Sequence, residues 1–414
     1  MAMYNVLVYI LAYIGLFATS FYIVSMIKHY KKIEPAPADD KTVTIIIPAY
    51  NEEKSIARTI KSALSVDYPR DNLEIIVVND GSKDKTYEIA KRFESSKLPK
   101  VKILTKPNGG KGSALNLGIK KARGEIIFTM DADTFVMPDA VKKMVGFFHE
   151  KKVMAVTPAM GVYKPKSIWQ RIQHIEYYIG IFLRKSFSTI NAIHITPGAF
   201  SAYRKIFFLK HGGYDEKNIT EDLEIALRIQ SKDYIIENSP TAVVYTIAPK
   251  EFKSLMRQRR RWYTGLIKNF WNYRRLFGFK KGPLGMFVLP VAIMTIALSV
   301  ILTIYLVIKT LSNIKDHLSL LNSINFQFNN LIELNSYIFE NFLYSFFSNP
   351  LILITILFIF LLGFYLYFAR KKMRYQESVK LNFVLFIILF TLLFTFWWIV
   401  SSFYILLNKR VVWR

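Results

Sequence analysis

The longest hydrophobic runs in this chain carry no charged residue. There are four such runs, at residues 5–27, 285–308, 351–368 and 383–407. A helix needs about 20 apolar residues to cross the hydrocarbon core of a bilayer, so each run is close to the length of a membrane span. The pattern predicts a transmembrane helix within residues 1–28 and a transmembrane region of about three spans over residues 285–414.

Between the first two runs, short apolar strands alternate with amphipathic helices. The predicted strands are residues 43–47, 73–78, 101–104 and 125–130, and the predicted helices are residues 55–64, 85–93 and 111–122. This alternation is typical of a mostly parallel sheet covered by helices on both faces. We therefore expect a Rossmann-like α/β domain at residues 42–250, joined to the first span by a linker at residues 29–41. Ligands bind such sheets at the carboxyl ends of the strands.

Two longer amphipathic helices are predicted at residues 168–187 and 252–271, with apolar residues at steps of three and four. Both could be ordinary core helices. Because they lie close to membrane spans and basic residues, we favour helices that lie in the membrane interface. The second falls in a predicted interfacial region at residues 251–284.

The chain is strongly basic, with a net charge of +26. A protein this basic could bind nucleic acid, but no nucleic-acid-binding motif accompanies the charge. Instead the basic residues flank the spans, at Lys28, Lys31, Lys32, residues 257–261, Arg274, Arg275, Lys280, Lys281 and residues 370–374. This is the distribution expected beside the cytoplasmic face of an anionic bilayer. We expect the partner to be the lipid bilayer and not nucleic acid.

The same charges predict the orientation. Residues 28–284 and the turn at residues 370–380 would be cytoplasmic, and the loop at residues 309–350 would lie outside, in a multi-pass plasma-membrane protein. The run at residues 5–27 is too long for a signal peptide, and its positive charges follow it. The chain has no cysteine, which excludes disulfides and fits a reducing cytosol.

Polar motifs follow the first three predicted strands. The loop PAYNEE, with Asn51 and Glu52, could hydrogen-bond a base or ribose. Asp80 in VVNDGS could accept a hydrogen bond from a nucleobase N–H. The glycine-rich loop NGGKGS opens a helix, where free N–H groups and Lys111 would attract an anion. Each motif on its own could equally be an ordinary turn or loop.

The fourth strand is followed directly by Asp131-Ala132-Asp133. Two carboxylates at i and i+2 beyond a strand can share one side of a turn and bind a hard divalent cation. Such a cation neutralises a diphosphate and stabilises it as a leaving group. An isolated motif of this kind is weak evidence, but here three other strand-end motifs accompany it.

Two further motifs lie downstream. Thr220-Glu221-Asp222 precedes the helical run at residues 223–229 and could cap that helix, could supply Asp222 as a general base, or could do both. In QRRRW most of the arginines would rest on lipid head groups. Arg261 could also bind diphosphate oxygens, and Trp262 could stack on a sugar ring.

The ordered set PAYNEE, VVNDGS, NGGKGSALN, DAD, TED and QRRRW resembles the membrane-integrated glycosyltransferase family 2 synthases. That group includes hyaluronan, cellulose, chitin and poly-N-acetylglucosamine synthases. The resemblance covers about residues 42–265 and the spans downstream. It implies a glycosyltransferase A-type domain combined with transmembrane and interfacial helices.

The resemblance also implies a role for each motif residue. The donor nucleotide would be bound by Asn51, Glu52, Asp80, Lys111, Asp131, Gln258 and Arg261. Mg²⁺ or Mn²⁺ would be held by Asp133 together with Asp131. Asp222 would be the catalytic base, with Glu221 beside it in the catalytic group. The acceptor would contact Trp262, Thr220 and Gly198, and Gly198 belongs to the segment PGAFS.

These roles imply a processive inverting enzyme that transfers a sugar from a UDP-sugar to a growing polysaccharide and moves the polymer across the membrane. UDP-N-acetylglucosamine is the favoured donor, because TED and the preceding GGY are closest to the poly-N-acetylglucosamine synthases. Small membrane or export subunits would be compatible partners. One alternative is a single-sugar transferase that uses a polyprenyl-phosphate carrier and does not need the QRRRW segment. A second is a non-catalytic scaffold, which would be expected to have lost Asp133 or Asp222.

Overall fold

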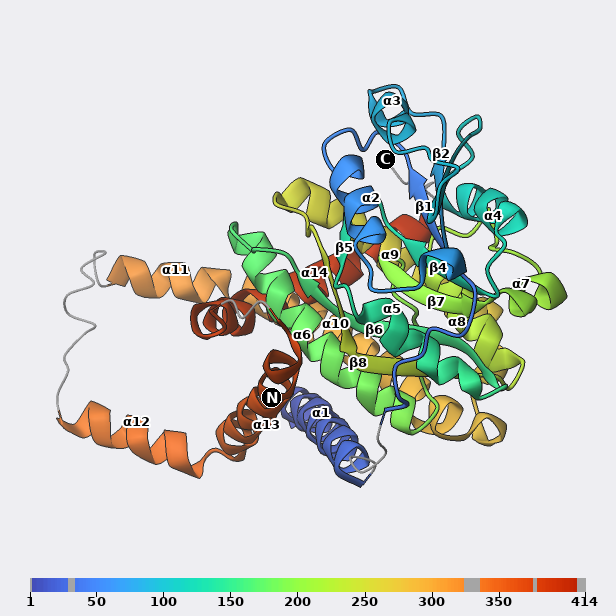
Figure 1. Ribbon diagram of the computed structural model, residues 1–414. Helices are drawn as coiled ribbons and strands as arrows, with labels where there is room; N and C mark the ends of the chain where they lie inside the picture. The colour runs from blue at the N-terminus through green and yellow to red at the C-terminus, as the bar shows by residue number, and fades with distance from the viewer. Residues whose placement is uncertain (1, 29–33, 324–335, 375–377, 408–414) are drawn as a thin grey trace. The chain divides into compact units, whose positions relative to one another are not determined.

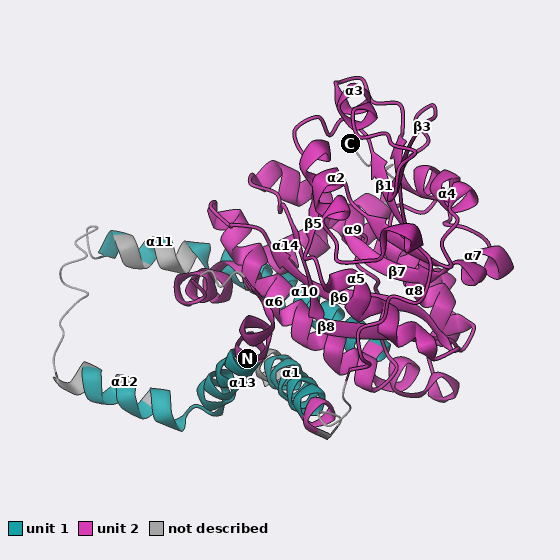
Figure 2. Cartoon of the chain, in the orientation of Figure 1, with its two compact units in different colours: residues 1–23, 289–364 teal, residues 24–288, 365–414 magenta. Residues whose placement is uncertain are grey.

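The computed structural model describes residues 2–28, 34–323, 336–374 and 378–407 (Figure 1). It divides into two compact units (Figure 2). Unit 1 comprises Met1–Ile23 and Leu289–Phe364, and unit 2 comprises Val24–Val288 and Tyr365–Arg414. All the motifs described above lie in unit 2.

The described part of unit 1 is helical. Its elements are most of α1 (Ala2–Lys28), then α10 (Leu289–Ser312), α11 (Ile314–Ser323), α12 (Ser336–Ser348) and most of α13 (Pro350–Lys372). Three helical segments are long and apolar enough to cross a membrane: Val6–Ile27, Leu284–Ser312 and Pro350–Lys372. They coincide with three of the four predicted spans, and their crossing of a membrane stays a prediction. The loop predicted to lie outside contains α11 and α12, and its residues 324–335 lie outside the described part of the chain.

The fourth predicted span corresponds to α14 (Lys380–Leu406), which belongs to unit 2. It bends by 44° between Lys380–Phe390 and Leu392–Ile405, so it counts as a span only if both pieces are taken together. It packs against α6 (Ile168–Thr189) and α9 (Phe252–Asn272).

The core of unit 2 is an eight-stranded sheet of order β3-β2-β1-β4-β7-β6-β8-β5. The strands are β1 (Val43–Ala49), β2 (Leu73–Asn79), β3 (Lys100–Thr105), β4 (Ile126–Met130), β5 (Thr134–Val136), β6 (Val153–Val162), β7 (Phe200–Arg204) and β8 (Ile235–Thr246). The first four in this order are parallel, as predicted. β7 is antiparallel to both of its neighbours, so the second half of the sheet is mixed. The strand order reverses at β1, which lies between β2 and β4, and this is where such sheets bind ligands.

Helices cover both faces of the sheet (Figure 1). Ile45 and Ile47 of β1 pack in one core with α2 (Ile56–Leu64), α3 (Thr86–Lys91) and α5 (Ala140–Val145). Ile46 points to the other face because side chains alternate along a strand. It packs there with α4 (Lys111–Lys121), α7 (Lys205–His211) and α8 (Glu221–Ser231). The four predicted strands and three predicted helices are confirmed, each end within two residues.

The apolar stripe of α6 is buried at Ile172 and Ile175, while Ile168 at its start is 41% exposed. Gln170 and Gln173 lie off this stripe and are nevertheless buried, and they donate hydrogen bonds to the main-chain carbonyls of Ala248, at 2.9 Å, and Pro249, at 3.0 Å. A buried amide is tolerated when its hydrogen bonds are made, as they are at both ends of the Gln170 amide, so polarity alone does not exclude a residue from the core. The placement of α6 and α9 in a membrane interface stays a prediction.

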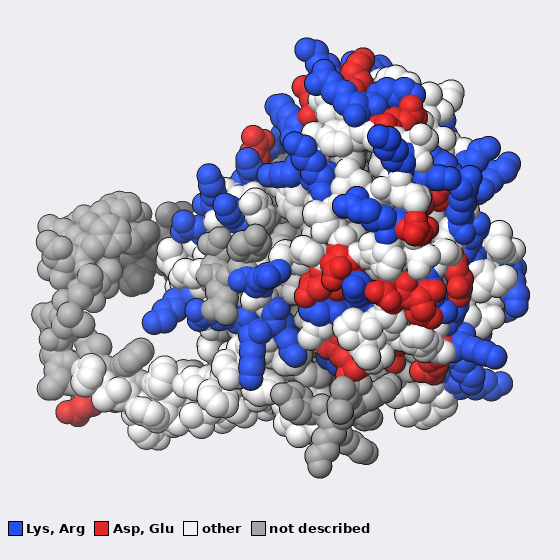
Figure 3. Space-filling view, in the orientation of Figure 1, with Lys and Arg blue, Asp and Glu red and all other residues white. Residues whose placement is uncertain are grey.

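Basic side chains are spread over the face of unit 2 seen in Figure 3, and acidic side chains gather between them near its middle. The positive charge on this face is therefore interrupted. Of the basic residues predicted to flank the spans, Lys31 and Lys32 lie outside the described residues.

The predicted linker is docked on the α/β domain from residue 34 onward. Glu34 Oε2 accepts hydrogen bonds from the hydroxyls of Ser239, at 2.9 Å, and Thr241, at 2.7 Å. Ala38 N–H donates to the carbonyl of Lys142 at 3.0 Å. Residues 34–41 have no regular secondary structure, but these hydrogen bonds hold them against the domain, and we call them the strap. Residues 29–33 lie outside the described part of the chain.

Candidate active site

A pocket of about 310 Å³ opens at the carboxyl ends of β1, β2 and β4. Its lining residues come from all four strand-end motifs: Pro48, Ala49, Tyr50, Glu52, Asp80, Asn108, Gly110, Lys111, Ala114, Asp131, Ala132 and Asp133. Motifs separated by up to about eighty residues in sequence thus meet at the point where the strand order reverses, as the parallel sheet predicted.

The turn Asp131-Ala132-Asp133 is held by its backbone. Asp131 N–H donates to the carbonyl of Ala199 at 3.0 Å, and the hydroxyl of Thr59 donates to the carbonyl of Ala132 at 2.7 Å. Both aspartates line the pocket. Asp133 Oδ1 also accepts a hydrogen bond from the hydroxyl of Thr246 at 3.4 Å. The turn therefore presents two carboxylates from a fixed main chain.

Negative charge accumulates at this turn. Burial raises the pKa of Asp133 to about 7, and the charges of Asp131 and Glu52 act in the same direction. A cation bound between these carboxylates would relieve the repulsion. The described residues include no group of three or more His, Cys, Asp or Glu placed to hold a metal. An ion held by this aspartate pair would therefore take its remaining ligands from substrate or water oxygens.

Lys111, the first residue of α4, connects this turn to the TED motif. Its Nζ lies 2.6 Å from Asp131 Oδ1 and 3.2 Å from Glu221 Oε1, and it donates to the carbonyl of Gly198 at 3.3 Å. Burial alone would lower the pKa of Lys111, but the charges of Asp131, Glu221 and Asp222 outweigh burial and raise it. Lys111 therefore stays cationic where a diphosphate is predicted to bind.

Asp222 lies in the first turn of α8. Its Oδ1 accepts from the N–H of Leu223 at 2.9 Å, and its Oδ2 accepts from the N–H of Gly198 at 3.3 Å. Burial raises the pKa of Asp222 to about 6, and Glu221 adds to the shift, while Lys111 and Arg261 oppose it. A carboxylate that is ionised at neutral pH and has a raised proton affinity suits a general base.

Thr220 does not act as the helix cap that the sequence allowed, because its side chain makes no capping hydrogen bond. Its hydroxyl accepts from Asn269 Nδ2 at 2.9 Å. A Cβ on Gly265 would lie 2.2 Å from the same hydroxyl, so α9 passes very close to Thr220. The structure thus places Thr220 in the packing between α8 and α9.

Gly198 packs directly against two side chains of the predicted site. A Cβ there would lie 2.7 Å from Lys111 Nζ and 3.2 Å from Asp222 Oδ2. Both of these atoms belong to the predicted catalytic machinery, so a methyl group would displace one or both of them.

We expect Gly198→Ala to lower sugar transfer by about 10-fold to 100-fold, because displacing reacting groups by a fraction of an ångström to an ångström is costly. Initial rates of transfer and thermal unfolding would be measured together. Gly112→Ala is the matched control, since a Cβ at Gly112 meets its nearest neighbour at 3.5 Å, an ordinary contact. Equal activity of the two variants would show that Gly198 has no such role.

Asp80 organises the glycine-rich loop. Its carboxylate accepts hydrogen bonds from Lys106 Nζ at 2.8 Å, Gly109 N at 3.0 Å and Gly110 N at 2.8 Å. Gly81, at a φ of +72°, allows the close approach of Asn108, whose N would lie 2.8 Å from an added Cβ. A carboxylate has about four acceptor positions, so one is left for the predicted nucleobase contact. The sequence did not reveal the contribution of Lys106.

Asn51 and Glu52 differ in placement. Asn51 has a φ of +54° and its Oδ1 accepts from Lys83 N–H at 2.8 Å, so it joins the loops that follow β1 and β2. Asparagine tolerates this left-handed conformation better than most residues. It does not line the pocket, whereas Glu52 does.

The QRRRW segment lies on α9. Arg261 Nη1 donates to the carbonyl of Ile219 at 3.4 Å, and its charge acts on both Asp131 and Asp222. Gln258 Oε1 is buried and has no hydrogen-bond partner within the described parts of the chain. Neither Gln258 nor Trp262 lines the pocket.

Arg259 contradicts the expectation that the arginines flanking Arg261 rest on lipid head groups. Its side chain is 1% exposed and is paired with Glu176 of α6. The signal that could have revealed this is the helical spacing, because Leu255, Arg259 and Tyr263 follow at steps of four and all are buried.

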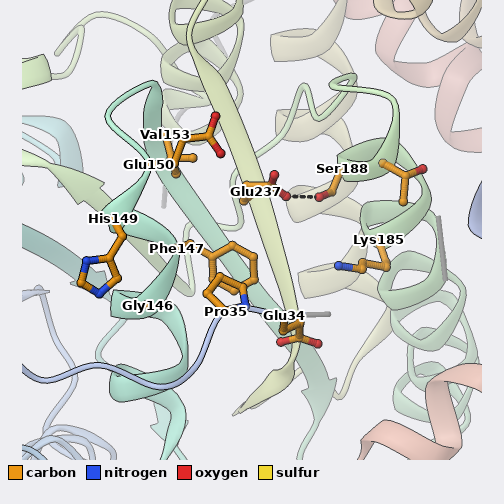
Figure 4. Close-up of a pocket in the computed structure, with 11 residues that line it drawn as sticks. Glu34, Pro35, Gly146, Phe147, His149, Glu150, Val153, Lys185, Ser188 and Glu237 are labelled. Carbon is orange, nitrogen blue, oxygen red and sulfur yellow. Dashed lines mark hydrogen bonds between the residues drawn. The ribbon is translucent and has the colours of Figure 1, made fainter. Parts of the chain in front are cut away.

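A second pocket, of about 360 Å³, lies at the amino ends of β6 and β8, beside the docked strap (Figure 4). Glu237 points across it and accepts a hydrogen bond from Ser188. None of the predicted site residues lines this pocket.

Comparison with known proteins agrees with the sequence motifs. Residues 44–212 match the model of the family described as glycosyl transferase family 2. The chain is 35% identical over 237 residues to a poly-beta-1,6-N-acetyl-D-glucosamine synthase of Staphylococcus epidermidis, covering 56% of this chain and 57% of that one. It is 36% identical over 232 residues to the probable glycosyltransferase YdaM of Bacillus subtilis, covering 54% of each chain. The chain thus spans a little over half the length of these curated relatives.

A solved structure shares the fold. The mannosyltransferase PcManGT from Pyrobaculum calidifontis, in complex with GDP-Man and Mn²⁺, superposes with a TM-score of 0.54 at 22% sequence identity. The superposition covers 89% of this chain and 100% of that chain. It confirms the predicted glycosyltransferase A-type fold.

Proposed function

We propose that this chain, in which residues 44–212 are a family 2 glycosyl transferase domain, is a processive synthase that builds a polysaccharide from a UDP-sugar at the membrane. The observation that carries the proposal is the contact of Lys111 with both Asp131 and Glu221. It joins the candidate metal turn to Glu221, the residue next to the candidate base Asp222, in one cluster at the switch point of the sheet.

The donor would lie in the pocket at the carboxyl ends of the strands. Glu52 and Asp80 would face the nucleoside, while Lys111 and Arg261 would balance the diphosphate charge. Asp131 and Asp133 would hold Mg²⁺ or Mn²⁺, which when bound neutralises the leaving diphosphate. The buried oxygen of Gln258, which has no hydrogen-bond partner among the described residues, would be available to a bound group.

Asp222 would remove the proton from the acceptor hydroxyl. As the proton passes to a carboxylate oxygen, the hydroxyl oxygen bonds to the anomeric carbon and the bond from that carbon to the diphosphate breaks. One direct displacement inverts the anomeric configuration and needs no covalent nucleophile. Glu221 would act on Lys111 rather than on the acceptor, because its carboxylate is paired there.

The proposed sugar is N-acetylglucosamine. The support comes from the name of the Staphylococcus epidermidis relative and from the TED and GGY motifs. The basic flanks support a cytoplasmic catalytic domain, and the three helices apolar enough to span a membrane support release of the polymer on the other side. The presence of both Asp133 and Asp222 within ordered surroundings counts against a non-catalytic scaffold.

The main alternative is transfer of one sugar to a polyprenyl phosphate, and Trp262 distinguishes the two. A polymerase must grip the new chain end after every addition, and an indole can stack on a sugar ring. We expect Trp262→Ala to leave UDP affinity within a few-fold and donor hydrolysis intact, while long product disappears. Product size would be measured by gel electrophoresis or mass spectrometry.

Trp271→Ala is the matched control, because Trp271 lies on the same helix and is 71% exposed. If wild type and Trp262→Ala add a single sugar to a lipid phosphate equally well, the lipid-carrier function replaces the proposed one.

A further inference from the structure

Arg259 lies at a buried junction between three helices of unit 2. It belongs to α9, while α6 contributes Glu176 and α14 contributes Trp397. Arg259 Nη1 lies 2.6 Å from Glu176 Oε1, and Nη2 lies 2.6 Å from Oε2. Two parallel charge-assisted hydrogen bonds fix direction as well as distance, so this pair sets the orientation of the guanidinium plane.

The same guanidinium lies over two indole rings. Its Cζ lies 4.5 Å from the ring centroid of Trp262 and 5.3 Å from that of Trp397. A guanidinium can contact aromatic faces while its edge donates to a carboxylate. Arg259 and Trp262 are three residues apart on α9 and are therefore neighbours on one side of that helix. The position of the Trp262 ring accordingly depends on Arg259, and that of Arg259 depends on Glu176.

The other side of α9 is attached to the helix that carries the candidate base. Asn269 donates to the hydroxyl of Thr220 at 2.9 Å, and Arg261 donates to the carbonyl of Ile219. Ile219 and Thr220 directly precede Glu221 and Asp222 in the chain. One helix thus holds Trp262 between two anchors, Glu176 on α6 and the start of α8.

We propose that Arg259 and Glu176 form a positioning pair that holds the Trp262 indole, and thereby the end of the growing glycan, in register with Asp222. This inference rests on the proposed function, in which Trp262 supports the acceptor. The pair acts through Trp262, because Arg259 is committed to Glu176 and to the two indoles. Burial also explains why the partner is a carboxylate, since a buried guanidinium without one would be strongly destabilising.

Glu176→Gln and Arg259→Lys test the pair. The first substitution keeps the shape of the Glu176 side chain but removes its charge, and the second keeps the charge of Arg259 but removes the planar fork. We expect UDP affinity within about three-fold of wild type and continued donor hydrolysis, with the ratio of hydrolysis to transfer raised about 10-fold or more and the product shortened. Arg257→Lys is the control, because Arg257 lies on the same helix and is exposed.

The double variant Glu176→Gln with Arg259→Gln removes both charges and avoids an unpaired buried ion. It should bind UDP and still make short product. Product of wild-type length from variants that bind UDP normally would overturn the inference. Loss of UDP binding in every variant would overturn it too, since the pair would then support the fold as a whole. Failure of the wild-type protein to make polymer would instead overturn the proposed function.

Discussion

Replacing Asp222 with asparagine is expected to lower sugar transfer by about 10²-fold or more, which is the contribution of a positioned general base. Asparagine keeps the shape of the side chain and its acceptor oxygen, so the contacts with Gly198 and Leu223 can persist. It cannot take up the acceptor proton. UDP affinity should stay within a few-fold, because Asp222 is not among the residues that line the donor pocket.

The pH dependence gives an independent test of the same role. The pKa of Asp222 is raised to about 6, so the basic form is lost as the pH falls through that value. Transfer by the wild-type protein should decline about tenfold per unit below about pH 6. At saturating Mn²⁺, which keeps Asp133 ionised, Asp222→Asn should lack this dependence. Asp215→Asn, at an exposed site in the preceding loop, should keep it. Near-normal turnover by Asp222→Asn would remove Asp222 from the role of base.

Replacing Asp133 with alanine is expected to abolish metal-dependent binding of UDP and to lower transfer by about 10³-fold, in line with the several kcal/mol that a bound metal contributes. The carboxylate of Asp133 is buried, and it lies near the negative charges of Asp131 and Glu52. Without it, Asp131 is left as the single aspartate of the turn, and Lys111 neutralises it.

Binding of UDP would be measured by calorimetry with and without Mg²⁺ or Mn²⁺, alongside transfer in excess chelator. Asp139→Ala is the control. Asp139 lies six residues after Asp133, does not line the pocket, and is paired with Lys143 at 2.7 Å. Transfer that persists in excess chelator would show that the two aspartates do not work through a metal.

The half of the sheet that carries the motifs could be predicted from the sequence because its signals are local. Each of β1, β2 and β4 is a short run of buried β-branched and apolar residues, and each ends at a polar loop. Parallel strands bring their carboxyl ends to one edge, so the meeting of Asp80, Lys111 and Asp131 followed from the alternation alone. The order of β6, β7 and β8 did not follow, because their pairing depends on contacts between distant parts of the chain.

The parts of the site that could not be predicted depend on partners far away in sequence. Glu176 and Arg259 are 83 residues apart. The helical spacing of α9 indicates that Arg259 is buried, but no local pattern marks Glu176 as its partner. Asp80 shows the same limit, because a carboxylate that serves a ligand and one that organises its own loop look alike in sequence. Thr220 directly precedes a helix, which is the position of a helix cap. Its hydroxyl instead accepts a hydrogen bond from Asn269, which lies 49 residues further along the chain.

The central claim is that this chain builds a polymer from a UDP-sugar, and product analysis tests it most directly. Purified protein in lipid would be incubated with Mn²⁺ or Mg²⁺ and each of a panel of UDP-sugars, and the products would be resolved by mass spectrometry. We predict a ladder of products, each longer by one N-acetylhexosamine residue, from UDP-N-acetylglucosamine. A single sugar attached to a lipid phosphate, or no product from any UDP-sugar, would contradict the account.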